Sequence, residues 1–236
     1  MSGEVRVFND YEYARAKIFV KLRRIHRALR KGAYLLIKRT FDIVCGLIGV
    51  VCLVPLALVV KIAALATGDT KSIFYTQNRI GQNGEEFKFY KFRSMVPDAD
   101  KVLFEMLAKD EKLAEEYKIN KKLQDDPRIT KMGKFLRKTS LDETPQLLNV
   151  LLGDMSLIGN RPYLPREKED MGNYFKDIVK TKPGITGYWQ VSGRSDTTFQ
   201  RRLELEQYYS KHCGLKMDIK IFINTFRVVL LHKGAK

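Results

Sequence analysis

The chain has 236 residues, of which 44% are hydrophobic and 30% charged, and these values exclude wholesale disorder. Only three cysteines occur, so the composition excludes a disulfide scaffold and fits a reducing compartment. The 43 Lys and Arg residues against 27 Asp and Glu give a net charge of +16. Such a charge predicts anionic partners, namely nucleic acid, phospholipid or phosphorylated small molecules.

Half of that excess charge lies in residues 1–39, which hold eleven Lys and Arg and three acidic residues. Within this segment Ile18, Leu22, Ile25 and Leu29 recur at helical spacing, and basic residues surround them. Residues 1–37 are therefore predicted to contain a basic amphipathic helix on an anionic membrane surface. An ordinary solvated helix would show the same pattern, but the apolar segment that follows favours the membrane.

Residues 43–60 contain no charged or strongly polar side chain. At ~1.5 Å per residue they would form a helix about 27 Å long, close to the ~30 Å of a hydrocarbon core. A buried core helix usually keeps a polar stripe, and a signal peptide would begin nearer the N-terminus, so membrane contact is favoured over both. Pro55 lies near the middle and removes one backbone hydrogen bond. The residues alone leave open a straight span and a broken helix that enters and leaves by one face.

Residues 68–236 are predicted to form a mixed α/β, helix-rich domain with a small β-hairpin. Two aromatic-rich strands, 73–80 and 85–93, flank an Asn-Gly turn that is typical of hairpins. Residues 182–194 hold three glycines and a proline, so they are predicted to form a shaped loop.

Helical patterns cover three further stretches of this domain. They are residues 98–124, residues 141–152, which Gly153 can terminate, and residues 218–231, with Ile219, Phe222, Ile223, Phe226 and Leu230 on one face. Nucleotide-binding glycine motifs, zinc-protease motifs and paired C-x-x-C motifs are absent, and the three histidines are scattered. Zinc and dinucleotide chemistry are therefore not favoured.

The strongest candidate for chemistry is the adjacent pair Asp142 and Glu143 at the predicted helix start. Carboxylates there lie in the positive end of the helix dipole, can hold a divalent cation, and one of them can attack phosphorus. The structural alternative is a capping box between Ser140 and Glu143. For an isolated Asp-Glu pair at a helix start, that alternative is the more common one.

Basic residues in three loops are candidates for phosphate binding. Arg161 lies between Gly159 and Pro162, and Arg194 ends the glycine-rich segment, whose glycines permit close approach of the backbone to a ligand. Lys91 and Arg93 end the second predicted strand. Each loop alone is weak evidence, because arginines are common on protein surfaces.

Asp98-Ala99-Asp100 matches the metal-binding D-x-D pattern of many glycosyltransferases, which would release UDP. That motif follows a nucleotide-binding βαβ region, and only about thirty non-membrane residues precede it here. Pro97 and Asp98 ahead of a charged amphipathic stretch are better explained as a helix start.

Taken in order, the motifs resemble the bacterial sugar transferases, the monotopic polyprenyl-phosphate phosphoglycosyl transferases that initiate surface glycan assembly. The resemblance covers roughly residues 38–231. Besides the proline in the apolar segment, it rests on Lys91-Phe92-Arg93-Ser94-Met95, Asp126-Pro127-Arg128-Ile129-Thr130, Leu141-Asp142-Glu143, Gly153-Asp154-Met155-Ser156, Arg161-Pro162, Lys182-Pro183-Gly184-Ile185-Thr186-Gly187 and Gln190-Val191-Ser192-Gly193-Arg194.

The resemblance implies that residues 38–67 form a re-entrant helix, broken at Pro55, that dips into one leaflet. Residues 68–236 would then be a catalytic domain on the cytoplasmic face of the bacterial inner membrane. By analogy Asp142 attacks the β-phosphate of a UDP-sugar, typically a UDP-hexose, and UMP leaves. Undecaprenyl phosphate then attacks the sugar-phosphoryl aspartate, in the first membrane step of exopolysaccharide, capsule or O-antigen synthesis.

The resemblance also implies Mg²⁺ bound by Asp142, with Glu143 orienting the metal site or assisting proton transfer. Residues expected to bind diphosphate or nucleotide are Arg161, Pro162, Arg194, Lys91, Arg93, Arg137 and Gln190. The expected partners are a UDP-sugar, undecaprenyl phosphate and membrane phospholipid, without nucleic acid, and a homodimer is one option. A non-enzymatic, membrane-anchored basic binding protein is the rival hypothesis, and it leaves the acid pair and the glycine loops unexplained.

Three positions depart from the family pattern. Val54 replaces the serine that often precedes the membrane proline, which predicts a less sharp break there. Asn160 stands where Gly-Pro-Arg-Pro is usual, which predicts a looser loop around Arg161. Thr144 replaces leucine after the acid pair, a change expected to be tolerated.

Overall fold

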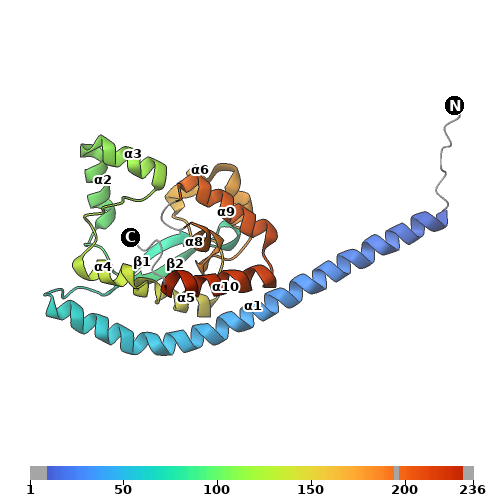
Figure 1. The fold of residues 1–236 in the computed structure, drawn as a ribbon, viewed down its shortest axis with the longest axis horizontal. Coiled ribbons are helices and arrows are strands. Elements are labelled where there is room, and N and C mark those ends of the chain that lie inside the picture. Colours follow the sequence, from blue (N-terminus) through green and yellow to red (C-terminus); the bar gives the residue numbers. More distant parts are fainter. Residues whose placement is uncertain (1–9, 194–196, 231–236) are drawn as a thin grey trace. The chain divides into compact units, whose positions relative to one another are not determined.

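The computed structural model of the chain describes residues 10–193 and 197–230 (Figure 1). It divides into two units, Met1–Thr40 and Phe41–Lys236. Helix α1 (Asp10–Ala66) contributes to both units. In the first unit the predicted helix is present, and the apolar side chains Ile18, Leu22, Ile25 and Leu29 are all exposed.

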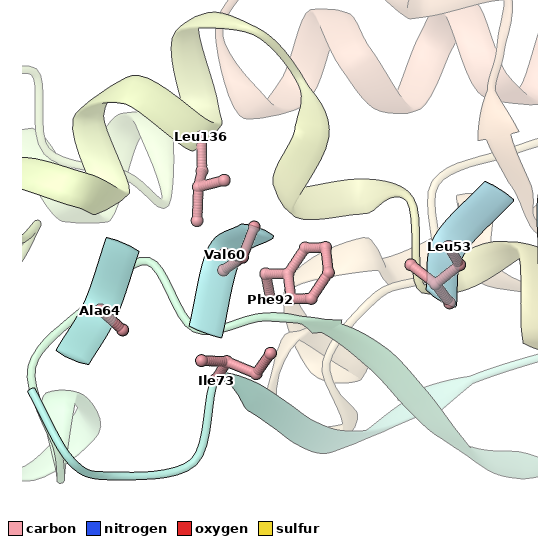
Figure 2. Close-up of a cluster of buried hydrophobic side chains, with 6 residues drawn as sticks. All are labelled: Leu53, Val60, Ala64, Ile73, Phe92 and Leu136. Carbon is pink, nitrogen blue, oxygen red and sulfur yellow. The ribbon is translucent and has the colours of Figure 1, made fainter. Parts of the chain in front are cut away.

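In the second unit, residues 41–66 of α1 bury one face against the rest of the domain. Leu53, Val60 and Ala64 lie on that face and form a cluster with Ile73, Phe92 and Leu136, as Figure 2 shows. Their spacing of seven and four residues places them on one side of a helix. The opposite face stays apolar and exposed; Val54, for example, is 70% exposed.

The helix runs through Pro55 without a break. Within the described residues, α1 is the one helix long and apolar enough to cross a membrane, judged by length and composition. The predicted helix interruption at Pro55 is therefore not seen in this structure.

The predicted hairpin is confirmed. Strands β1 (Phe74–Ile80) and β2 (Glu86–Phe92) pair antiparallel, with Phe74 opposite Phe92 and Ile80 opposite Glu86. The 3-10 turn η1 (Gln82–Gly84) joins them, and Asn83 takes the left-handed conformation that an Asn-Gly turn tolerates.

A second, parallel pair consists of β3 (Ser156–Ile158) and β4 (Gly184–Thr186). Neither strand is predicted from the sequence: β4 lies in the predicted loop at residues 182–194, and no element is predicted at residues 156–158. Each is only three residues long, so their local pattern is too short to identify.

The remaining elements are helical. In chain order they are α2 (Ala99–Lys109), α3 (Glu111–Asn120), α4 (Lys131–Lys138), η2 (Leu141–Glu143), α5 (Gln146–Leu152), η3 (Pro165–Glu167), α6 (Lys168–Met171), η4 (Gly172–Tyr174), α7 (Phe175–Ile178), α8 (Tyr188–Ser192), α9 (Phe199–His212) and α10 (Leu215–Leu230). The domain is thus helix-rich with a small amount of sheet, as predicted.

Two predicted helices are each divided. The stretch 98–124 splits at Asp110, whose side chain accepts hydrogen bonds from the backbone N–H groups of Lys112 and Leu113 and so starts a new helix. The stretch 141–152 splits before Pro145, because a proline inside a helix removes a backbone donor. Gly153, with φ of 99°, ends the second part as predicted.

Candidate active site

A cavity of about 1010 Å³ opens in the second unit beside the hairpin, and η2, α8, and residues of α2 and α3 contribute to its wall. Seven residues predicted for the site line it. They are Lys91, Arg93, Arg137, Asp142, Glu143, Arg161 and Gln190. Residues distant in sequence thus gather at one place, whereas the role predicted for each stays a prediction. Arg194 lies outside the described residues.

Asp142 lies in η2 and is 7% exposed. Ser140, the residue before η2, has a left-handed backbone, and its side chain makes no capping bond, so the capping-box alternative is wrong. Burial raises the pKa of the Asp142 carboxyl, and the positive charges of Lys91 and Arg137 counteract that rise. The carboxylate is therefore largely desolvated and lies near positively charged side chains.

Asn149 of α5 fixes the position of Asp142 relative to the hairpin. Its buried side chain accepts a hydrogen bond from the Tyr90 backbone N–H at 3.1 Å and donates one to the Lys88 carbonyl at 2.6 Å. Because η2 directly precedes α5, this clamp holds the acid pair against the strand that carries Lys91.

Lys91 and Arg137 bring two cations to this carboxylate from different elements, β2 and α4. Desolvation, with Arg79 and Arg137 nearby, lowers the pKa of Lys91 to about 8, and the Asp142 and Glu143 carboxylates oppose that shift. The Nε of Arg137 donates to Ser94 Oγ at 3.0 Å, and burial lowers the pKa of this guanidinium too. Burial is the main cause of both lowered pKa values, so two desolvated cations lie near the acid pair, an arrangement that suits an anionic ligand.

Arg79 belongs to the same cavity and was missed in the sequence. It is 7% exposed, its Nη1 donates to the Pro162 carbonyl at 3.1 Å, and its Nη2 donates to Gln77 Oε1 at 3.0 Å. Burial and the neighbouring Arg161 lower its pKa to about 10. A sequence signal existed, since Tyr75, Gln77 and Arg79 alternate within the predicted strand and so lie on one face of it, and all three line the cavity.

The loop at Gly159–Pro162 is firmly held, so the predicted loosening by Asn160 is wrong. The side-chain amide of Asn160 is 2% exposed and donates to the Ile178 carbonyl at 3.2 Å, Thr181 Oγ1 at 3.1 Å and Ser210 Oγ at 2.6 Å. The sequence predicted a looser loop because the hydrogen-bond acceptors of Asn160 lie on segments that are distant in sequence.

Arg161 follows this anchor, and its side chain lines the cavity. Its backbone N–H donates to Glu206 Oε1 at 2.9 Å, and its buried Nε has no acceptor among the described residues. A buried guanidinium N–H without a protein acceptor is suited to donate a hydrogen bond to an anionic ligand. Pro162 does not line the cavity; it is buried behind the loop, and its carbonyl receives Arg79.

The glycines of the 182–194 segment have a different role from the one predicted. A side chain at Gly184 or Gly187 would collide with the backbone of Gly159. They therefore permit two protein backbones to approach each other closely, which lets β4 and the start of α8 lie against the Arg161 loop.

Two predicted binding residues are already engaged with protein groups. Arg93 pairs with Asp69 at 2.7 Å and donates to the Ser72 carbonyl at 2.7 Å. Gln190 donates through Nε2 to the Ile185 carbonyl at 2.9 Å, while its buried Oε1 has no donor among the described residues. Arg93 thus braces the wall of the cavity.

The rejected D-x-D motif is also at the cavity, where Asp98 precedes α2 as predicted. Asp100 accepts hydrogen bonds from Arg166 at 3.0 Å and Gln77 at 3.4 Å, which engages its carboxylate within the protein.

A divalent cation would rely on Asp142 and Glu143. Within the part of the chain that the structure describes, no group of three or more His, Cys, Asp or Glu side chains could hold a metal by itself. Mg²⁺ is usually bound by one or two carboxylates together with substrate phosphates. The acid pair fits an ion of that kind.

Comparison with known proteins gives a consistent result. Residues 33–232 match the sequence profile of the family described as bacterial sugar transferase. The undecaprenyl-phosphate galactose phosphotransferase of Salmonella typhimurium is 44% identical over 92% of this chain and 45% of its own length. The exopolysaccharide production protein ExoY of Sinorhizobium fredii is 40% identical over 84% of this chain and 87% of its own length.

A third relative is the UDP-glucose:undecaprenyl-phosphate glucose-1-phosphate transferase of Escherichia coli, 35% identical over 86% of this chain and 42% of its own length. The chain therefore spans less than half of two of these relatives and most of the third. The Salmonella typhimurium and Escherichia coli relatives are named as transferases that act on undecaprenyl phosphate.

Proposed function

The chain belongs to the bacterial sugar transferase family, and from this membership we propose that it transfers a hexose-1-phosphate from a UDP-hexose to undecaprenyl phosphate and releases UMP. The observation that carries the proposal is the buried carboxylate of Asp142 between Lys91 and Arg137 at the cavity. A carboxylate that is dry, yet kept near cations, can act as a nucleophile toward a phosphate that those cations bind.

In the first step, a carboxylate oxygen of Asp142 forms a bond to the β-phosphorus. The bond from that phosphorus to the oxygen bridging the two phosphates breaks, and UMP leaves with this oxygen and its electron pair. In the second step, a phosphate oxygen of undecaprenyl phosphate forms a bond to the same phosphorus, the bond to Asp142 breaks, and the carboxylate is restored. Neither step needs a net proton transfer.

The surrounding cations would stabilise the charge on the phosphate oxygens during both steps. Lys91 and Arg137 lie next to the nucleophile, and Arg79 and Arg161 extend the positive charge along the cavity. Preorganised cations of this kind are the main source of catalysis in phosphoryl transfer. Mg²⁺ held by Asp142, with Glu143 beside it, would supply further screening of the diphosphate charge.

For the membrane we propose that residues 43–60 lie within one leaflet and that both flanks stay cytoplasmic. Asp42 at one end of this segment bonds to Ser156, and Val60 at the other end packs on Leu136 (Figure 2). Both ends thus contact the same domain, which a straight span through the bilayer would prevent. The exposed apolar face of this segment supports contact with lipid.

The cytoplasmic side follows from the proposed donor, because nucleotide sugars are made in the cytosol. Single cysteines placed at positions 2 and 236 of a variant that lacks Cys45, Cys52 and Cys213 should both react with an impermeant thiol reagent from the cytoplasmic side only. Labelling from opposite sides would mean that the segment spans the membrane.

The activity is tested with purified full-length protein, Mg²⁺, undecaprenyl phosphate and a series of UDP-hexoses and UDP-N-acetylhexosamines. The expected product is UMP with at least one donor, and Asp142→Asn should abolish its release. Asp98→Asn is the matched control, because it changes a carboxylate at the same cavity that the mechanism does not use. Release of UDP, or full activity of Asp142→Asn, would contradict the proposal.

A further inference from the structure

We propose that Glu206 is a positioning residue for Arg161, which it holds toward the diphosphate of the donor by fixing the loop backbone and balancing its charge. The inference rests on the proposed function, since it assumes that Arg161 binds this diphosphate. Glu206 belongs to α9, an element without any predicted site residue, and it is fully buried.

The geometry of α9 supports this role. Glu206 and Ser210 are four residues apart and therefore lie on the same face of the helix, one turn from each other. Ser210 Oγ accepts from the Asn160 amide at 2.6 Å, and Glu206 Oε1 accepts from the Arg161 backbone N–H at 2.9 Å. Two consecutive residues of the loop are thus attached to successive turns of one helix.

The charge of Glu206 distinguishes it from a simple packing residue. A buried carboxylate is costly unless cations and hydrogen bonds compensate for its desolvation. Burial raises the pKa of Glu206 to about 7, while the Arg161 backbone N–H and the guanidinium groups of Arg202 and Arg161 favour its ionised form. A carboxylate retained at such a position is well placed to offset the mutual repulsion of these two arginines.

Arg202 links this buried layer to the cavity wall. Its guanidinium lies 4.6 Å from the ring centre of Trp189 and is 4% exposed. Trp189 lines the cavity, as Arg161 does. Glu206 therefore lies behind the wall, among the groups that hold Arg161 and Trp189, and does not line the cavity itself.

Loss of the Glu206 charge should weaken donor binding more than it slows the chemical step. Asp142, Lys91 and Arg137 are carried by other elements, so they would keep their positions. Glu206→Gln retains an oxygen that can accept from the Arg161 N–H but removes the charge. We expect it to raise KM for the UDP-hexose roughly tenfold, with kcat lowered less than about threefold.

A double-mutant cycle separates positioning from a general structural role. If Glu206 acts through Arg161, Glu206→Gln should change KM by less than about twofold in an Arg161→Ala background. An equal KM increase in both backgrounds, or no increase in either, would overturn the proposal. If Glu206→Gln does not fold, Ser210→Ala is put through the same cycle with the same criterion, because it loosens the same loop without removing a buried charge.

The dissociation constant for UDP gives a readout that needs no turnover. It is measured for the four proteins of the cycle, namely the wild type, Glu206→Gln, Arg161→Ala and the double variant. Non-additive losses of UDP affinity are expected. If the wild-type chain releases UMP but the decreases in UDP affinity caused by Glu206→Gln and Arg161→Ala are additive, the Glu206 inference alone is overturned. A wild-type chain that neither releases UMP nor binds UDP would overturn both the inference and the proposed function.

Discussion

The carboxylate of Asp42, where the apolar part of α1 begins, accepts a hydrogen bond of 3.1 Å from Ser156 Oγ, the first residue of β3. A second bond, of 2.9 Å, comes from the Leu157 backbone N–H. Asp42 is 3% exposed, so this contact joins the apolar helix to the domain through a buried charge. The aromatic rings of Phe41 and Phe222, 5.4 Å apart, make a second contact beside it.

Asp42→Ala should therefore destabilise the domain, because it leaves the Ser156 hydroxyl and the Leu157 N–H buried without their acceptor. The expected loss is about 2–3 kcal/mol in the free energy of unfolding. Denaturation in detergent measures it. Asp69→Ala is the control, since this carboxylate is 35% exposed and its removal should cost less than about 1 kcal/mol. Equal losses would contradict the anchoring role of Asp42.

The lowered pKa of Lys91 predicts that activity falls at alkaline pH. Its pKa is lowered to about 8, so the cation is present below that pH and is lost as pH rises through it. If the charged form binds the diphosphate, kcat/KM should fall above about pH 8, because this quantity reports the free enzyme. Lys91→Arg should move the fall to higher pH. An unchanged alkaline limb in Lys91→Arg would exclude Lys91 as its cause.

Arg79→Lys keeps a positive charge but cannot bond both the Pro162 carbonyl and Gln77 as the guanidinium does. KM for the donor should rise roughly tenfold because the Arg161 loop loses support. Arg166→Lys is the matched control: this side chain lines the same cavity but is 38% exposed, and its partner is Asp100. Similar KM values for the two variants would argue against Arg79 as a structural support of the site.

The exposed face of α1 should carry the contact with lipid. Val54→Asp places a charge on that face, where Val54 is 70% exposed. A charge in the hydrocarbon costs about 2.5–3.5 kcal/mol, so partition into vesicles should fall roughly a hundredfold. Ile119→Asp, on α3 and 51% exposed, changes an exposed apolar residue outside α1 and should leave partition unchanged. An equal decrease for both variants would contradict a specific lipid-facing surface.

Local patterns account for the parts of the fold that were predicted correctly. The hairpin depends on alternating strands and the Asn83–Gly84 turn, and α10 depends on an apolar repeat; both signals lie within a few residues. The pairing of β3 with β4 could not be predicted, because it joins two three-residue strands across a long intervening segment.

The residues of the candidate site also fall into those that the sequence identifies and those whose role depends on tertiary packing. The acid pair, Lys91 and Arg161 were identified from motifs and Arg137 from the family resemblance, and the structure brings them to one cavity. Glu206 was not identified, since a single glutamate in a charged helical stretch resembles a solvated surface residue until α9 is packed against the loop. Asn160 was misjudged for the same reason, because its three acceptors come from distant segments.

The central claim is that Asp142 forms a covalent bond to the sugar phosphate. The most direct measurement is intact-protein mass spectrometry of the chain after incubation with Mg²⁺ and an accepted UDP-hexose, without undecaprenyl phosphate, followed by peptide mapping. We predict one equivalent of UMP, an added mass of one hexose phosphate on the peptide that contains Asp142, and neither in Asp142→Asn. UMP release that requires the lipid acceptor and leaves no adduct, or an adduct on another residue, would contradict the account.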